Sequence, residues 1–278
     1  MIILVIKANM LDKLKNKGWE IKPYSGSDVI FQNEFKEKLI ELENILDSFK
    51  IPIREIMCEG GGVHPVNKRF SLLLNDIYEK EIQFKSTITT TIGKNEREIG
   101  RLEERDSHNL DFFYQGKQKN LGIEVEWNSK VLAFERDIGN FRRLFINSAI
   151  HLGIIITKGE SLHKKLETIC EDFFKKRINT KNWIDSVNSI EKELSNYKDC
   201  NDKNLNFKSF TPRQIKNINN MIDKGTKDYK AIAKSYYRDK WGGQTSYINS
   251  LVERIERGGF LGIPILCIGI PSGVIDLN

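Results

Sequence analysis

The chain has few cysteines, and those it has are scattered. Cys58, Cys170, Cys200 and Cys267 form no CxxC pair. Their spacing argues against a structural zinc site and against a disulfide framework. We therefore expect reduced thiols and a cytoplasmic protein.

Long apolar runs are also missing. The apolar start, Ile2–Ile6, is far shorter than the roughly 20 residues of a membrane-spanning helix, and it lacks the flanks of a signal peptide. It is typical of a buried strand. We expect a soluble protein without a membrane partner.

A phosphate-binding loop of the Walker type is not supported either. Three consecutive glycines occur in residues 59–65, but no Gly-Lys-Ser or Gly-Lys-Thr ending follows them. The glycines predict a flexible loop that leads into a helix. His64, within this loop, is expected to be a loop residue rather than a ligand.

The positive charge is unevenly distributed. The 278 residues carry a net charge of +6, with 39% hydrophobic and 29% charged residues, an ordinary globular composition. Residues 160–257 hold 20 Lys and Arg against 14 Asp and Glu, whereas the rest of the chain holds 24 of each. The whole excess therefore lies in one segment, where bases could contact nucleic acid.

Hydrophobic periodicity predicts a mixed α/β fold. Helical spacing occurs over 35–49, 70–78 and 130–145, where Glu135, Arg136, Asp137, Arg142 and Arg143 are expected to be exposed. Strands are predicted at 84–92, 110–114, 122–127, 152–157 and 262–270. Residues 7–27 are expected to be loop with short structure, and the charged run 96–106 a solvated loop or helix face.

The basic segment favours helix throughout. Helices are predicted at 162–176, 183–197, 212–224, 229–237 and 246–257, with no convincing strand between them. We therefore divide the chain into a core, 1–159 and 258–278, and a basic helical insertion, 160–257, that could serve as a DNA-recognition subdomain.

The chemistry is concentrated around Gly122–Trp127. In a strand, Glu124 and Glu126 share one face, about 7 Å apart at roughly 3.3 Å per residue. A polar turn separates this strand from Asp111, so a hairpin would place Asp111 beside Glu124. Converging carboxylates repel one another unless a divalent cation neutralises them.

These acids suggest metal-dependent hydrolysis. Hard oxygen ligands suit Mg²⁺, with Mn²⁺ as a substitute. Asp111, Glu124 and the carbonyl of Val125 would bind the metal, and Glu126 would position or deprotonate the attacking water. The acid pattern alone is weak, and exposed strand acids are the alternative interpretation.

Four separated segments resemble the type II restriction endonucleases of the BglII/BamHI type. They are Leu110-Asp-Phe-Phe, Ile123-Glu-Val-Glu-Trp, Leu152-Gly-Ile-Ile-Ile-Thr-Lys-Gly and Ile263-Pro-Ile-Leu-Cys-Ile-Gly-Ile. BglII carries similar runs in the same order. Glu126 stands where most of the superfamily has lysine, and in this it is similar to BamHI, which has glutamate there. Residues 160–257 form a segment far longer than the matching part of BglII.

The resemblance implies a PD-(D/E)XK nuclease fold with a mixed sheet flanked by helices, a homodimer, and Mg²⁺-dependent cleavage of double-stranded DNA at a palindrome. A site with GATC at its centre is the first expectation. By position, Asp111, Glu124 and Val125 would bind the metal and Glu126 would complete the catalytic set. Glu98 could supply a fourth acid, and Lys130 could contact the scissile phosphate.

Further DNA contacts are expected from polar and basic side chains near the acids and in the insertion: Asn128, Ser129, Lys234, Arg238, Lys240, Gln244 and Thr245. Two alternatives remain open. One is a nuclease of the same superfamily, acting in repair or phage defence without sequence specificity. The other is a DNA-binding protein without catalysis.

Overall fold

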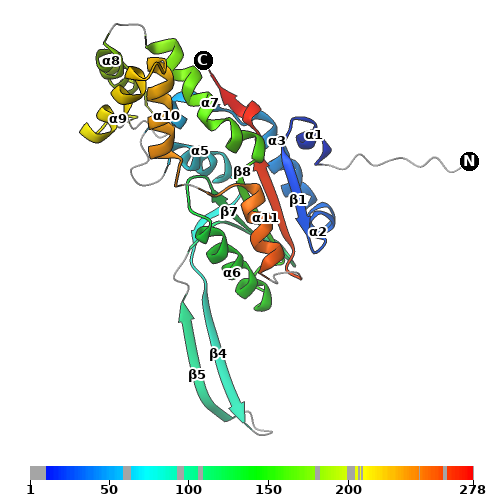
Figure 1. Ribbon diagram of the computed structural model, residues 1–278. Helices are drawn as coiled ribbons and strands as arrows, with labels where there is room; N and C mark the ends of the chain where they lie inside the picture. The colour runs from blue at the N-terminus through cyan, green and yellow to red at the C-terminus, as the bar shows by residue number, and fades with distance from the viewer. Residues whose placement is uncertain are drawn as a thin grey trace, which may run out of the picture.

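A six-stranded mixed sheet forms the centre of the protein (Figure 1). The computed structural model describes residues 11–58, 64–92, 97–105, 109–178, 182–198, 204–205, 207, 209–243, 245–258 and 262–277. In sheet order the strands are β1 (Glu20–Tyr24), β9 (Ile265–Ile270), β8 (Leu152–Lys158), β7 (Asn120–Glu126), β6 (Leu110–Gln115) and β3 (Glu79–Ile82). The strands β7, β8 and β9 are parallel, and the outer pairings are antiparallel.

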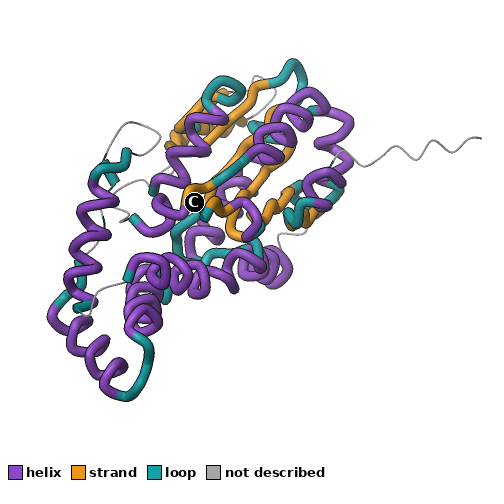
Figure 2. Tube along the Cα trace, turned by 90° about the horizontal axis from the view of Figure 1, so that it is seen from above, coloured by secondary structure: helices purple, strands orange, loops and turns teal. Residues whose placement is uncertain are grey.

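Helices cover both faces of this sheet (Figure 2). They are α1 (Asp12–Asn16), α2 (Ser27–Glu34), α3 (Lys36–Ser48), α4 (Ile53–Met57), α5 (Pro65–Leu74), α6 (Leu132–Ile146), α7 (Glu160–Arg177), α8 (Trp183–Ser195), α9 (Pro212–Asp223), α10 (Asp228–Lys240) and α11 (Ile248–Arg257). The helices α6 and α11 share one hydrophobic cluster with the sheet, whereas α3, α5, α7 and α10 share the other. Both clusters are built from alternating strand residues, as the period of a strand requires. The predicted mixed α/β fold is confirmed.

The crossover from β7 through α6 to β8 places a helix directly over the expected acids. Gly122 and Gly153 let α6 approach closely, since a Cβ on Gly153 would lie 2.4 Å from the Phe141 ring. Strand β8 is buried along its whole length, as predicted for a central strand. The helix therefore faces the same side of the sheet as Glu124 and Glu126.

The insertion is helical, as predicted, with α7 to α11 at the expected positions. Most of its buried apolar side chains belong to the two clusters that also contain the sheet. The segment therefore shares its hydrophobic core with the rest of the chain, and its role as a recognition subdomain stays a proposal.

The prediction for the charged run 96–106 was wrong. The charged run 96–106 contains a strand, β5 (Arg97–Arg105), which pairs with β4 (Lys85–Ile92) in a two-stranded hairpin that projects from the body (Figure 1). Within residues 7–27, expected to be loop with short structure, residues 20–24 form the edge strand β1, where Pro23 is tolerated because an edge strand needs fewer ladder donors. A further short pair joins β2 (Ile51–Pro52) to β10 (Ile275–Asp276).

Other predictions at the chain's start concern residues outside the described part, including the strand at Ile2–Ile6. Within the described ranges, no helix is both long enough and apolar enough to span a bilayer. Cys58, Cys170 and Cys267 are buried free thiols.

Candidate active site

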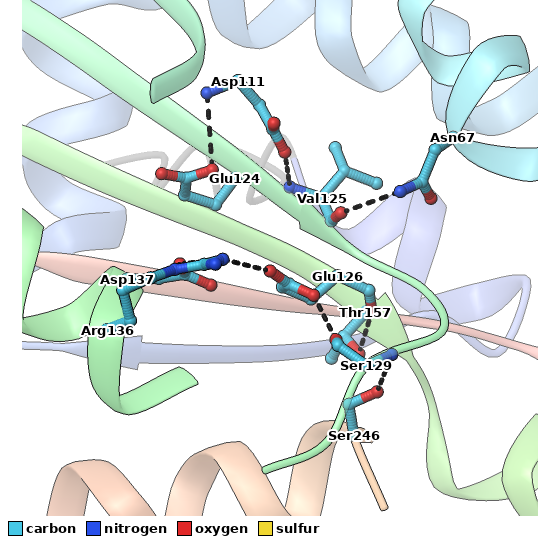
Figure 3. A network of polar contacts seen from close by, with 10 residues as sticks. All are labelled: Asn67, Asp111, Glu124, Val125, Glu126, Ser129, Arg136, Asp137, Thr157 and Ser246. Carbon is cyan, nitrogen blue, oxygen red and sulfur yellow. Dashed lines mark hydrogen bonds and ion pairs between the residues drawn. The ribbon is translucent and has the colours of Figure 1, made fainter. Parts of the chain in front are cut away.

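The β6–β7 hairpin brings Asp111 and Glu124 together, as predicted (Figure 3). Phe112 lies opposite Ile123, so the two acids are neighbours across the strands. The amide of Val125 donates to Asp111 Oδ2 at 2.8 Å, and the amide of Asp111 lies 3.4 Å from Glu124 Oε2. The pairing holds both carboxylates against the backbone of the partner strand.

The carbonyl of Val125 lies beside these acids. Its oxygen accepts a long hydrogen bond, 3.5 Å, from Asn67 Nδ2 on α5. Asn67 was not among the predicted residues, because it lies in a helix far upstream and no local pattern marks it. A polar side chain from α5 therefore borders the site (Figure 3).

Glu126 is held from three directions. Arg136 Nη2 donates to its carboxylate at 3.1 Å, and the hydroxyl of Ser129 donates to the other carboxylate oxygen. Thr157 on β8 donates to its carbonyl at 2.7 Å. The side chain is 12% exposed, so one edge of this fixed carboxylate faces solvent.

Asp137 is a fourth acid, and its expected exposure was wrong. It belongs to α6, its side chain is fully buried, and Arg136 contacts it at 3.0 Å. The signal was present in the sequence: Asp137 lies three residues after Phe134 and four before Phe141, both core residues, so it shares their helix face. Its charged neighbours in the sequence, Glu135 and Arg136, made this part of the helix resemble an exposed surface.

Burial and mutual repulsion dominate the electrostatics. Burial raises the pKa of Asp111 and raises the pKa of Glu124 well above the usual range, and the charge of Asp111 adds to the effect on Glu124. The pKa of Asp137 is also raised well above normal, first by burial and then by the charge of Glu126. Arg136 opposes this but is one cation among four acids.

The donor chemistry of this cluster fits a hard divalent cation. Asp111, Glu124 and the Val125 carbonyl offer the oxygen ligands that Mg²⁺ prefers. Burial, the largest cause, raises the pKa values of both acids, and a bound cation would favour their charged forms. In the described part of the chain, however, no three or more acidic, histidine or cysteine side chains are already arranged as a metal cage.

A second polar network ties the end of β7 to the α10–α11 connection. The amide of Ser129 donates to the hydroxyl of Ser246 at 3.3 Å, and the amide of Ser246 donates to the carbonyl of Ser129 at 3.3 Å. Lys158, fully buried, donates to the carbonyl of Trp127 and lies 3.5 Å from the Ser246 hydroxyl. Burial lowers the Lys158 pKa to about 7. Neither Lys158 nor Ser246 was among the predicted site residues defined by charge and spacing.

The other predicted residues fall into three groups. Lys130 is exposed just after the acids, Asn128 is half-buried, and Thr245 accepts a 3.4 Å hydrogen bond from the amide of Val131. Lys234 and Arg238 are exposed on α10, whereas Lys240 donates to the carbonyls of Ile56 and Cys58. Gln244 lies outside the described residues.

The hairpin holds the remaining candidate, Glu98. Its backbone pairs with Thr91 near the tip of the projecting β4–β5 arm (Figure 1), and its side chain is outside the described part. The structure does not bring it to the other acids. Asp137 lies beside them instead.

His64 has a structural position. Its Nδ1 accepts the amide of Val66 and so caps α5, and its ring packs near Trp127 and Trp241. The expectation that it is not a ligand stays a prediction, since the preceding glycines lie outside the described residues.

Comparison with protein families gives one match over most of the chain. The family model described as "Restriction endonuclease BglII/BglIII" matches residues 19–270. Comparison with individual curated proteins gives no significant match. The six-stranded mixed sheet flanked by helices is a restriction-endonuclease-like fold.

Proposed function

The chain belongs to the BglII/BglIII restriction-endonuclease family, and we propose that it is a type II enzyme that hydrolyses both strands of a palindromic DNA site. The observation that supports this is the hydrogen-bonded pairing of Asp111 with Glu124 and Val125 across the β6–β7 hairpin. This pairing supports the proposal because it brings together Asp111 and Glu124, the two acids that the resemblance implies as metal ligands.

Mg²⁺ is the proposed cofactor, with Mn²⁺ as a substitute. Asp111, Glu124 and the carbonyl of Val125 would hold it. When bound, such a cation polarises a scissile phosphate and makes a bound water more acidic. It would also neutralise the acids whose pKa values burial and repulsion raise.

Glu126 is proposed to act on the attacking water. Arg136 and Ser129 fix both of its oxygens, so the carboxylate is oriented before substrate binds. A carboxylate in this place can accept a proton or align a water. Asp137 is a positioning residue, because it shares Arg136 with Glu126.

The proposed partner is double-stranded DNA, bound by a homodimer in the cytoplasm. Asn128, Ser129, Lys130 and Thr245 adjoin the acids in the chain or through hydrogen bonds and would contact the DNA near the cleaved bond. A palindrome with GATC at its centre is the first target to test.

The decisive variant is Glu124→Ala. Removing this carboxylate should abolish Mg²⁺-dependent cleavage, by at least about a thousandfold for a loss of roughly 4 kcal/mol in transition-state stabilisation. Binding of a labelled duplex without metal should change little. Glu37→Ala, an exposed acid on α3, is the control that keeps full activity. Unchanged cleavage by Glu124→Ala would refute the site.

The substrate pattern separates the alternatives. Digestion of one plasmid with the wild type and Mg²⁺ should give discrete fragments whose ends, read by run-off sequencing, share one sequence. A smear would instead indicate a nuclease without sequence specificity. Binding without any cleavage in Mg²⁺ or Mn²⁺ would indicate a non-catalytic DNA-binding protein.

A further inference from the structure

Helix α10 carries a stripe of bases. Lys230, Lys234 and Arg238 recur at four-residue spacing, and Lys227 precedes them at the helix N-cap, so all four lie along one face. All four are exposed. Lys230 pairs with Glu171 at 3.2 Å, whereas Lys234 and Arg238 have no ion pair within the described residues.

Helix α9 runs beside this stripe and forms a polar cleft with it. Four residues connect the two helices, including Gly225 with φ of +88°. A short turn with glycine also connects the helices of DNA-binding helix-turn-helix motifs. The cleft has a volume of about 360 Å³ and is lined by Thr211, Arg213, Gln214, Asn217, Met221, Ser235, Arg238 and Asp239.

Most of the chain's positive excess belongs to this helix pair. Residues 209–243 contain eight Lys and Arg against three Asp and Glu, a net charge of +5 out of +6 for the whole chain. A net positive charge of this density on a surface attracts a polyanion.

The surface does not resemble a protein-binding face. Protein interfaces are depleted of lysine at their centres and are rich in large apolar side chains. No large apolar side chain that is strongly exposed in the described part of the chain lies on α9 or α10. The charge and the polar lining therefore favour nucleic acid over a second copy of the chain.

The stripe leads outward from the candidate active site. Trp241, which follows α10, packs its ring 6.1 Å from Trp127, the residue after Glu126. The helix spans about 17 Å from Arg238 to Lys227, at about 1.5 Å per residue. This length is comparable with the distance covered by roughly five phosphates along one DNA strand. The helix pair lies at the outside of the molecule, away from the β4–β5 hairpin (Figure 1).

We propose that α9 and α10 form a phosphate-binding surface that holds duplex DNA on one side of the cleaved bond. Arg213 and Arg238 flank the cleft and contact one stretch of backbone, and Lys234 and Lys227 extend the contact outward. This inference rests on the proposed function, because it names where that DNA substrate is bound.

The test measures the salt dependence of DNA binding. The double variant Lys234→Ala/Arg238→Ala is compared with wild type on a fluorescein-labelled 40-base-pair duplex in metal-free buffer. The control, Lys22→Ala/Lys36→Ala, removes two equally exposed bases from β1 and α3, outside the insertion. Circular dichroism and thermal unfolding verify that both variants are folded.

The expected result is a smaller salt slope for the α10 variant. Two lost phosphate contacts reduce the slope of log affinity against log salt by about two and weaken binding roughly tenfold at low salt. The control should keep the wild-type slope. Adding Arg213→Ala should lower the slope by about one more.

The outcomes separate this inference from the function itself. If the wild type cleaves DNA but the α10 variant keeps the wild-type slope, the surface assignment is wrong and the nuclease assignment stands. A changed oligomer mass with an unchanged slope would also overturn it, since the face would then be a protein interface. If the wild type binds but never cleaves, the nuclease proposal fails while the slope still tests the surface.

Discussion

Four carboxyl groups and one guanidinium share a mostly buried space at the end of β7. Asp111 and Glu124 face each other through backbone hydrogen bonds, while Glu126 and Asp137 share Arg136. The pKa values of Asp111, Glu124 and Asp137 are raised, chiefly by burial. Keeping these acids ionised in a buried site is unfavourable, and a bound cation would stabilise their charged forms.

Glu124→Gln should therefore stabilise the metal-free protein. A carboxyl whose pKa is raised on folding binds its proton more tightly in the native state. Stability then falls as the pH rises from the unfolded pKa near 4 towards the native value. Glutamine removes this loss and can still accept the Asp111 amide, so the free energy of unfolding should rise by about 1 kcal/mol at pH 7.5.

Urea unfolding in EDTA at pH 5 and pH 7.5 measures this effect. The gain from Glu124→Gln should be larger at the higher pH, whereas Glu37→Gln, an exposed acid on α3, should show no such difference. A variant that is less stable than wild type at pH 7.5 would contradict the electrostatic account.

At this scale the strand alternation predicted the pairing of Asp111 with Glu124, because both acids follow from one local hairpin. Asp137 was misassigned because a charged residue between two core positions of a helix resembles a surface residue. Asn67 and Ser246 lie 58 residues before Val125 and 117 residues after Ser129, respectively. Contacts at such separations leave no trace in local periodicity.

At the scale of elements, the connection between α10 and α11 supports the end of strand β7, which carries Glu124 and Glu126. Ser246 is fully buried and holds Ser129, whose hydroxyl donates to Glu126, and Lys158 holds both Ser246 and the Trp127 carbonyl. The basic helices are thus connected by a short polar path to the proposed catalytic carboxylate.

Ser246→Ala should weaken cleavage more than DNA binding. Losing the Ser246 hydroxyl leaves the Ser129 amide without its acceptor and loosens Glu126, at about 1–2 kcal/mol or roughly tenfold in kcat. Ser129→Ala should have a similar effect. The double variant should be hardly worse than either single one, because both substitutions break the same path.

Steady-state cleavage of the mapped substrate at saturating concentration measures kcat, and duplex binding without metal measures affinity. Additive losses in the double variant, or equal losses in affinity and rate, would show that the two serines only support the fold. Ser195→Ala, an exposed serine on α8, is the control for loss of a hydroxyl.

Elements that depend on local periodicity could be predicted from the sequence, whereas strands that depend on pairing with another strand could not. The helices α6 to α11 and the strand β8 were predicted from local periodicity, and their positions are confirmed. Strand β5 was taken for a loop or helix face because its charges hide the alternation, and only its pairing with β4 makes it a strand. Edge strand β1 likewise depends on β9, about 245 residues later.

At the scale of the whole molecule, the number of sites per chain bears on assembly. The described part of the chain contains one carboxylate cluster with the Asp111–Glu124 pairing. One such cluster serves one phosphodiester bond at a time. The proposed cleavage of both antiparallel strands of a palindrome therefore favours two copies related by a two-fold axis.

Mixed dimers test this assembly directly. Light scattering after gel filtration should give twice the chain mass of 32.2 kDa. When wild type is mixed and re-equilibrated with excess Glu124→Ala, most active dimers carry one functional site, so supercoiled plasmid should accumulate as nicked circles rather than linear DNA. A monomer mass with and without DNA, together with direct linear product at every mixing ratio, would show that each chain cuts both strands alone.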